Sequence, residues 1–204
     1  MLTLHHLEHS RSHRILWLLE ELQISFDLKT YARNSKTLFA PDELKTIHPL
    51  GKSPLLTDGD RVIAESGAII EYLLNYDDKG KNFVPKSEDG QVAFKFWLHY
   101  AEGSLMPVLL VSLIFKRVEN APVPFFIKPI VKNICKQVEK AFILPQFRTH
   151  ITFIENHLSQ SEYFAGDVFT AADIQMSYPL EALHGRGSLG SDYPMIEKFL
   201  ERMK

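Results

Sequence analysis

The feature that most constrains the fold is the stretch of residues 48–74, which alternates turn signals with short apolar runs. A turn-forming segment, residues 48–51, leads through Lys52-Ser53-Pro54 into the first apolar run. Asp58-Gly59 is a preferred dipeptide of tight β-hairpin turns, so the apolar runs on its two sides should pair. Ser66 then precedes residues at helical spacing, and its hydroxyl is predicted to cap that helix. The stretch therefore predicts a β-hairpin followed by a capped helix.

The residues before this stretch supply the other elements of an α/β domain. Residues 1–6 are short and apolar, as in a strand, and residues 14–22 carry apolar side chains at helical spacing. Residues 25–29 alternate as a half-buried strand does, and a short helix is expected after Pro41. The predicted order is β-α-β-α-β-β-α, which we assign to a first domain of residues 1–76.

The remainder of the chain predicts a linker and a helical domain. Residues 77–89 are charged and contain Gly80 and Pro85, a composition typical of a connection between domains. Strand signals end there, so residues 90–204 are predicted to be an all-α helical-bundle domain. Its first long helix has an apolar stripe formed by Phe94, Trp97, Leu98, Ala101, Leu105, Val108 and Leu109.

Three further helices are expected in this domain. One covers residues 122–157, with a stripe formed by Ile127, Ile130, Val131, Ile134, Val138 and Phe142. Another begins at Thr170, which has capping-box spacing with Asp173, and the last covers residues 194–203. Pro107 and Pro145 are expected to bend or split the two long helices.

Charge and cysteine content limit the classes of function. The net charge of −2 gives no electrostatic footprint for nucleic acid or an anionic membrane. The single cysteine, Cys135, excludes an internal disulfide framework and is typical of a reducing compartment. No export signal opens the sequence, and the apolar run of residues 106–115 is too short to span a bilayer. We therefore expect a cytoplasmic protein with no membrane or nucleic-acid partner.

Two motifs in the hairpin region resemble a known family. Residues 49–54 and 64–69 resemble, in sequence and spacing, the glutathione-binding half of the thioredoxin-like domain in cytosolic glutathione S-transferases. The resemblance implies a cis bond before Pro54, with the backbone of Ser53 pairing with the cysteinyl part of glutathione. It also implies that Glu65 and Ser66 hold the γ-glutamyl end. The segment of residues 96–107 resembles one bacterial and fungal group of the family.

The resemblance also implies which residues bind the glycyl carboxylate of glutathione and which residue activates its thiol. Lys52 is the expected partner of the glycyl carboxylate, and Lys45 or Lys36 could assist. A glutathione transferase must hold the thiol as thiolate, because the thiolate is the nucleophile. In serine-type members the catalytic serine lies four residues before the arginine that opens the first helix, which here is Ser10, and Ser12 would then cap that helix. The alternative is that both serines are only caps.

The second substrate should be an apolar electrophile. Leu7, Tyr100, Met106 and Leu109 are the predicted lining of its pocket, although each of them could equally belong to an ordinary core. Glu102 occupies a position where relatives keep an acidic or polar group near the amino end of the ligand. Four histidines precede residue 14, but their spacing does not complete a metal-ligand set, so no metal is expected.

The predicted function is a two-domain, serine-type glutathione S-transferase that takes glutathione as co-substrate and acts as a homodimer. Two alternatives remain open from the sequence. One is a non-catalytic glutathione-binding regulatory module of the same fold, and the other is a glutathione-dependent peroxidase or thiol-lyase that uses the same thiolate. Apolar lining residues do not identify one electrophile.

Overall fold

The computed structural model describes residues 1–35, 37–185, 189 and 192–204. Its first part is a mixed four-stranded sheet in the order β2-β1-β3-β4. The central strand β1 pairs in parallel with β2 and antiparallel with β3, which in turn pairs antiparallel with β4. The elements are β1 (Leu2–Leu7), α1 (Ser12–Glu21), β2 (Phe26–Tyr31), α2 (Glu43–Ile47), β3 (Leu55–Asp58), β4 (Arg61–Ala64) and α3 (Ser66–Leu74). This is the predicted order, and the thioredoxin-like expectation is confirmed.

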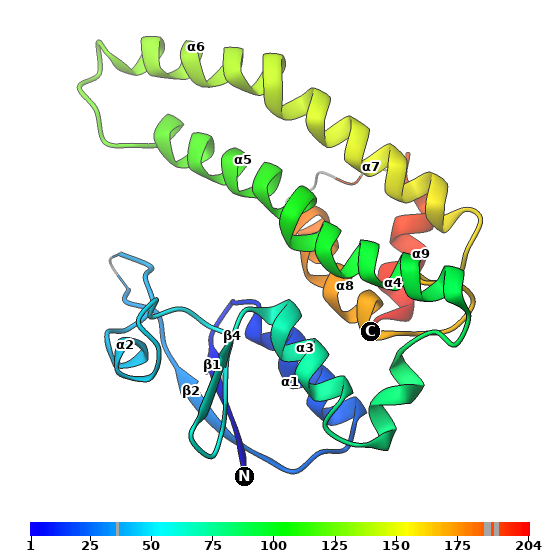
Figure 1. Cartoon of the computed structure of the whole chain (residues 1–204). Helices are drawn as coiled ribbons and strands as arrows, with labels where there is room; N and C mark the ends of the chain where they lie inside the picture. The colour runs from blue at the N-terminus through cyan, green and yellow to red at the C-terminus, as the bar shows by residue number, and fades with distance from the viewer. Residues whose placement is uncertain (36, 186–188, 190–191) are drawn as a thin grey trace.

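The predicted β3–β4 hairpin forms, and its two turn residues are Gly59 and Asp60. Asp58 faces Arg61 in the strand register, and Gly59 has a φ of 57°. A positive φ carries little steric cost for glycine, which explains why this residue follows Asp58 in a two-residue turn. Helices α1 and α3 lie side by side against the sheet (Figure 1). Leu4, Leu18 and Ile70 are fully buried between these layers.

The second part of the chain is helical (Figure 1). A 3₁₀ turn (Asp78–Phe83) follows α3, after which come α4 (Glu88–Tyr100), α5 (Met106–Glu119), α6 (Lys128–Val138), α7 (Leu144–Leu158), α8 (Ala171–His184) and α9 (Pro194–Arg202). The first predicted stripe is buried along its whole length. Helix α8 is buried on most of its surface and packs against α1 and α3 as well as α4, so it joins the two parts.

The two long helices continue through their prolines. A π-helical turn (Ala101–Leu105) connects α4 to α5, and another (Glu139–Ile143) connects α6 to α7. Pro107 and Pro145 lie directly after these turns, within the first turn of the next helix. Proline has no N–H for the helical ladder, and each irregular turn lies where that bond is missing. The expected split is therefore a wide turn in a continuous helix.

The continuity of α4 and α5 changes one expectation, that the apolar run of residues 106–115 is too short to span a bilayer. Residues 88–119 form one helix of 32 residues, which is long and apolar enough to cross a membrane by length and composition alone. Core helices of soluble proteins pass the same test, and 39% of its most apolar window is buried within the single chain.

The second predicted stripe is not a core. Ile130, Ile134 and Phe142 are at least half exposed, whereas Cys135 beside them is buried. Helices α5 and α6 form a hairpin that extends beyond the rest of the molecule (Figure 1), and α6 packs mainly against α5. The helical periodicity is confirmed, and much of the stripe lies at the surface of the single chain.

Candidate functional site

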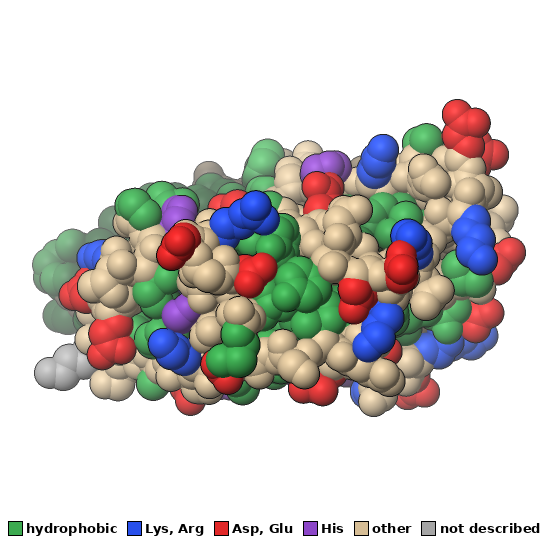
Figure 2. Space-filling model, turned by 60° about the horizontal axis from the view of Figure 1, so that its bottom comes forward, with side chains coloured by type: hydrophobic (Ala, Val, Ile, Leu, Met, Phe, Trp, Pro, Cys, Tyr) green, Lys and Arg blue, Asp and Glu red, His purple; other side chains and the backbone are tan. Residues whose placement is uncertain are grey.

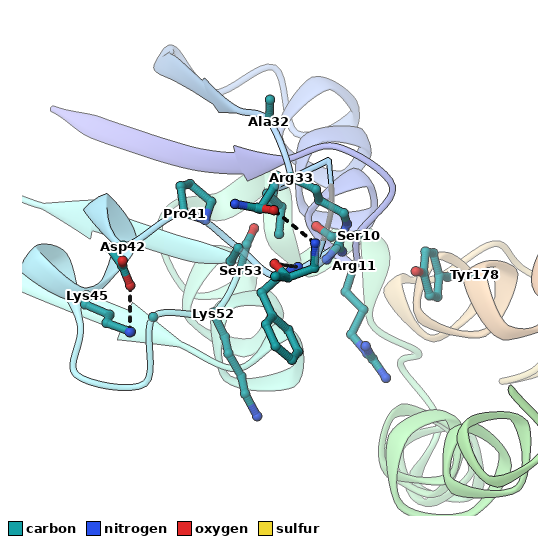
Figure 3. A pocket seen from close by; sticks show the side chains of 16 residues that line it. Ser10, Arg11, Ala32, Arg33, Pro41, Asp42, Lys45, Lys52, Ser53 and Tyr178 are labelled. Atoms are coloured by element: carbon teal, nitrogen blue, oxygen red, sulfur yellow. Dashed lines mark hydrogen bonds and ion pairs between the residues drawn. The ribbon is translucent and has the colours of Figure 1, made fainter. Parts of the chain in front are cut away.

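The loops at one end of the sheet surround a cavity of about 870 Å³. Its wall combines Leu7, Ser10 and Arg11 from the β1–α1 junction with Lys52 and Ser53 from the loop before β3. Tyr178 of α8 faces this cavity from the helical domain (Figure 3). A smaller cavity of about 290 Å³ shares Arg11, Lys52 and Ser53 with the larger one, so the two adjoin.

The predicted glutathione residues line these two cavities. Pro54, Glu65 and Ser66 line the smaller one. The Ser53–Pro54 peptide bond is cis, as the resemblance implied, and the Ser53 hydroxyl donates to the carbonyl of His5 at 3.0 Å. Together with the Ser10, Lys52 and Ser53 of the larger cavity, these residues surround one continuous region. Lys45 also lines the larger cavity, but its ammonium is paired with Asp42 at 2.6 Å, and Lys36 lies outside the described residues.

Ser10 is buried beside the first turn of α1. Its Oγ accepts the backbone N–H of Ser12 at 3.2 Å and lies 2.8 Å from the Ser12 hydroxyl oxygen. The predicted capping role of Ser12 is wrong, because Ser12 is already the first residue of α1. The Ser12 Oγ instead accepts the N–H of Leu7 and lies 2.9 Å from Nδ1 of His6. Ser10, not Ser12, therefore satisfies a free N–H of the first turn.

The predicted cap at Ser66 also needs correction. Ser66 is the first residue of α3, and no side chain caps this helix. Its Oγ accepts a hydrogen bond from Nε2 of Gln175 at 3.3 Å. The preceding Glu65 has a φ of 72°, a left-handed conformation that is costly for a residue with a β-carbon and is concentrated at functional sites.

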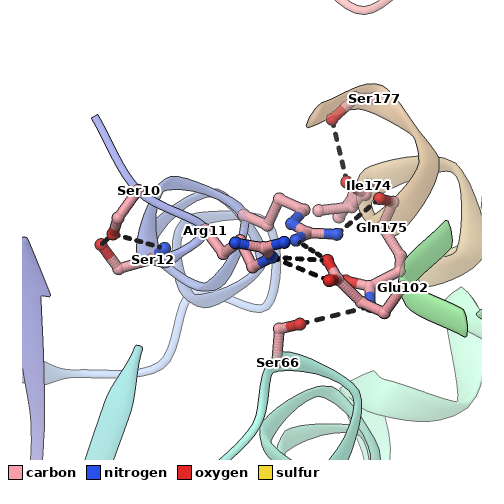
Figure 4. A network of polar contacts seen from close by, with 9 residues as sticks. Ser10, Arg11, Ser12, Ser66, Glu102, Ile174, Gln175 and Ser177 are labelled. Carbon is pink, nitrogen blue, oxygen red and sulfur yellow. Dashed lines mark hydrogen bonds and ion pairs between the residues drawn. The ribbon is translucent and has the colours of Figure 1, made fainter. Parts of the chain in front are cut away.

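A charged network joins the two domains (Figure 4), and two of its members, Arg11 and Glu102, line the smaller cavity. Nε of Arg11 donates to both carboxylate oxygens of Glu102, at 2.8 and 2.9 Å, and Nη2 of Arg14 binds one of them. Arg14 is fully buried, and its guanidinium lies 5.0 Å from the ring centre of Tyr178. Burial lowers the pKa of Arg14, and the carboxylate of Glu102 opposes this effect. Glu102 is thus engaged by two arginines of its own chain.

The predicted pocket for the second substrate is only partly supported by position. Leu7 lines the larger cavity. Tyr100 and Leu109 are buried in the core, and Met106 packs against that core, so none of the three lines either cavity. The helical domain instead contributes Tyr178 to the larger cavity, and Leu110 and the predicted Glu102 to the smaller one.

Arg14 was missed as an interdomain residue, although a signal was present. It lies four residues before Leu18 and eight before Leu22, on the apolar face of the helix that it opens. A charge on such a face requires a partner from another element. No sequence signal distinguished Tyr178 or Leu110 from their apolar neighbours. Among the described residues, no group of three or more His, Cys, Asp or Glu side chains could hold a metal ion.

Comparison with known proteins defines the class of this molecule. The family model of the glutathione S-transferase N-terminal domain matches residues 1–75, and that of the C-terminal domain matches residues 121–204. The chain therefore belongs to the glutathione S-transferase family, as its motifs and fold predicted.

Individual relatives agree with the fungal and bacterial resemblance. Glutathione S-transferase 1 of Saccharomyces cerevisiae is 35% identical over 98% of this chain and 89% of its own length. Glutathione S-transferase 3 of Schizosaccharomyces pombe is 38% identical over 89% of this chain and 74% of its own. A crystal structure of a glutathione S-transferase from Actinobacillus pleuropneumoniae is 35% identical and has a TM-score of 0.78, covering 100% of this chain and 86% of its own.

Proposed function

We propose that this glutathione transferase binds glutathione across the two adjoining cavities and activates its thiol with the Ser10 hydroxyl. The observation that supports this most directly is the gathering of Ser10, Lys52 and Ser53 around one cavity next to Glu65 and Ser66. These residues come from three separate segments of the chain. Their convergence is what recognition of an extended, charged tripeptide requires.

The two carboxylates of glutathione have separate partners in this arrangement. Ser66 lies at the N-terminus of α3, where free backbone N–H groups favour an anion. The Ser66 hydroxyl already accepts from Gln175, so its own proton can be donated to the γ-glutamyl carboxylate. Lys52 is exposed, lines both cavities and supplies a cation for the glycyl carboxylate.

The cysteinyl thiol then lies near Ser10. At pH 7 a free thiol with a pKa near 8.5 is only a few per cent ionised. A hydrogen bond donated by Ser10, with the nearby positive charge of Arg11, stabilises the thiolate over the thiol. The thiolate attacks the electrophilic carbon of the second substrate, a carbon–sulfur bond forms, and the electron pair leaves with the departing group or moves along a conjugated acceptor.

The second substrate is proposed to be small and apolar. Leu7, Phe39 and Tyr178 contribute apolar surface to the larger cavity, and Phe39 is 74% exposed there. Leu110 extends this surface on α5. Such side chains favour an apolar electrophile without selecting one reaction.

We also propose that the protein is a homodimer in the cytoplasm. The exposed stripe on α6, with Ile130 and Ile134, is an apolar surface of the kind that marks protein interfaces. On α7, Leu144 and Phe153 line a hollow of about 750 Å³. A different face, the one at the bottom of the view in Figure 1, intersperses acidic and basic side chains and carries no field of one sign (Figure 2). Sedimentation that gives a monomer at micromolar concentration would contradict the dimer.

One experiment separates the enzyme from its alternatives. The protein is captured on immobilised glutathione, and turnover is then measured with aryl halides, enals and hydroperoxides. We expect capture, with conjugation of at least one carbon electrophile. Turnover of hydroperoxides alone would identify a peroxidase, and capture without turnover would identify a binding module.

A further inference from the structure

A chain of three polar side chains leads from strand β1 to the Ser10 hydroxyl. Nδ1 of His6 lies 2.9 Å from the Ser12 Oγ, which in turn lies 2.8 Å from the Ser10 Oγ. The Ser12 Oγ also accepts the N–H of Leu7 at 3.2 Å and can donate its proton to the carbonyl of the same residue, also at 3.2 Å. Ser12 is fully buried, so these protein groups are its partners. The orientation of each proton in the chain therefore depends on its neighbours.

The acceptor positions of Ser12 decide what the Ser10 proton can do. A serine hydroxyl has one proton and accepts two hydrogen bonds, and Leu7 N–H already occupies one acceptor position on Ser12. If Nδ1 of His6 carries a proton, it donates to Ser12 and fills the second position. Ser12 then donates to the Leu7 carbonyl or to Ser10, and in both cases the Ser10 proton is free. If Nδ1 is bare, the second position is open; Ser10 then donates to Ser12 and has no proton left for a ligand.

We propose that His6 is a positioning residue, which through Ser12 directs the Ser10 hydroxyl proton toward the thiol of bound glutathione. This inference rests on the proposed role of Ser10. It gives a role to His6 and Ser12, neither of which lines the two cavities. The Nδ1–H form of His6 is the productive one, and a bound thiolate that accepts the Ser10 proton in turn favours that form.

The surroundings of His6 favour its neutral form, so the hydrogen bond to Ser12 depends on which ring nitrogen carries the proton. Burial lowers the pKa of His6, and the nearby His13 on α1 lowers it further, while Glu8 after β1 raises it. The neutral imidazole therefore predominates at neutral pH, and its proton sits on either Nδ1 or Nε2. Side chains alternate across a strand, which places His6 on the same face of β1 as the buried Leu4, the face that α1 covers.

The test uses two substitutions of nearly equal shape. His6→Asn keeps an amide N–H near the position of Nδ1, whereas His6→Asp offers only carboxylate oxygens. The thiolate absorbance of bound glutathione is titrated against pH for each. We expect His6→Asn to stay close to the wild type. His6→Asp should raise the pKa of the bound thiol by about 1–2 units, because Ser10 then donates to Ser12.

The added negative charge of His6→Asp acts through space as well, so both variants are repeated with Ser12→Ala. Without the Ser12 hydroxyl the chain is cut, and the difference between Asn and Asp should shrink to the through-space part. An equal Asn–Asp difference with and without Ser12, or no difference with Ser12 present, would overturn the relay. Failure of the wild type itself to depress the thiol pKa would instead refute the proposed role of Ser10.

A second measurement does not depend on the folding of any variant. Nitrogen-15 NMR of the wild type reports which nitrogen of His6 carries the proton. We expect the Nδ1–H form to increase when glutathione is bound. A bare Nδ1 in the glutathione complex would overturn the proposal.

Discussion

Nη1 of Arg14 donates a hydrogen bond of 2.7 Å to the main-chain carbonyl of Gln175, 161 residues further along the chain. Arg14 opens the helical run of the first domain, and Gln175 lies in α8 of the second. With the ion pair to Glu102, which lines the smaller cavity, this bond fixes α1 against the helical domain. The position of Ser10 and Arg11 therefore depends on a contact between domains.

Replacing Arg14 should destabilise the protein strongly. Arg14→Met removes the buried guanidinium and leaves the Gln175 carbonyl without its donor, while Glu102 keeps only Arg11. Breaking one partner of a buried ion pair costs about 3–5 kcal/mol. Arg11→Met is the matched control. Its side chain is 37% exposed, so its loss should lower the free energy of unfolding by about 1 kcal/mol or less. Equal losses in denaturant titrations would contradict this account.

Lys52 should govern the affinity for glutathione more than the chemical step. Lys52→Met removes the proposed cation for the glycyl carboxylate, and a hydrogen bond to a charged group is typically worth about 1.5–3 kcal/mol. We expect the KM for glutathione to rise roughly ten-fold with kcat little changed. The loss should shrink at high salt, because the site is exposed. Lys198→Met, on the exposed surface of α9, serves as the control; an unchanged KM for Lys52→Met would remove Lys52 from the site.

Asp173 should make stability depend on pH. Burial raises the pKa of this carboxyl from its ordinary 3.8 to about 6, opposed by hydrogen bonds from Phe164 and Thr170. Between these two values the folded state binds more protons than the unfolded state. The contribution of Asp173 to the free energy of unfolding should therefore fall by about 3 kcal/mol as pH rises from about 4 to about 6.

The comparison that isolates this effect is with Asp173→Asn, which cannot titrate. Urea unfolding of both proteins across this pH range gives the difference. The difference curve should slope downward to about pH 6 and then become flat. A flat curve throughout, or a rising one, would show that the carboxyl titrates at or below its ordinary pKa in the folded protein.

The sequence was most informative where local chemistry decides the structure. The Asp58-Gly59 turn, the Thr170–Asp173 pair and the buried stripe on α4 and α5 all formed as predicted. Each depends on residues a few positions apart. The cis bond at Pro54 was implied by family resemblance and not by the residues themselves.

The failures at Ser66 and in the second-substrate pocket share a cause, which is that the deciding partner lies far away in the sequence. Ser66 was predicted to cap its own helix, but its hydroxyl meets Gln175, 109 residues away. A helical stripe likewise does not say what covers it. Tyr100 is covered by the core, whereas Leu110, further along the same continuous helix, lines the smaller cavity.

The most direct test of the account is the ionisation of glutathione bound to the wild type and to Ser10→Ala. The thiolate absorbance is followed against pH for both, with Ser159→Ala, on the exposed end of α7, as control. We predict a depressed pKa of the bound thiol in the wild type and in the control. Ser10→Ala should raise that pKa by about 1–2 units and lower turnover roughly ten- to hundred-fold, with glutathione affinity little changed. An unchanged titration in Ser10→Ala would contradict the central claim and transfer thiol activation to Arg11 or to the N-terminus of α1.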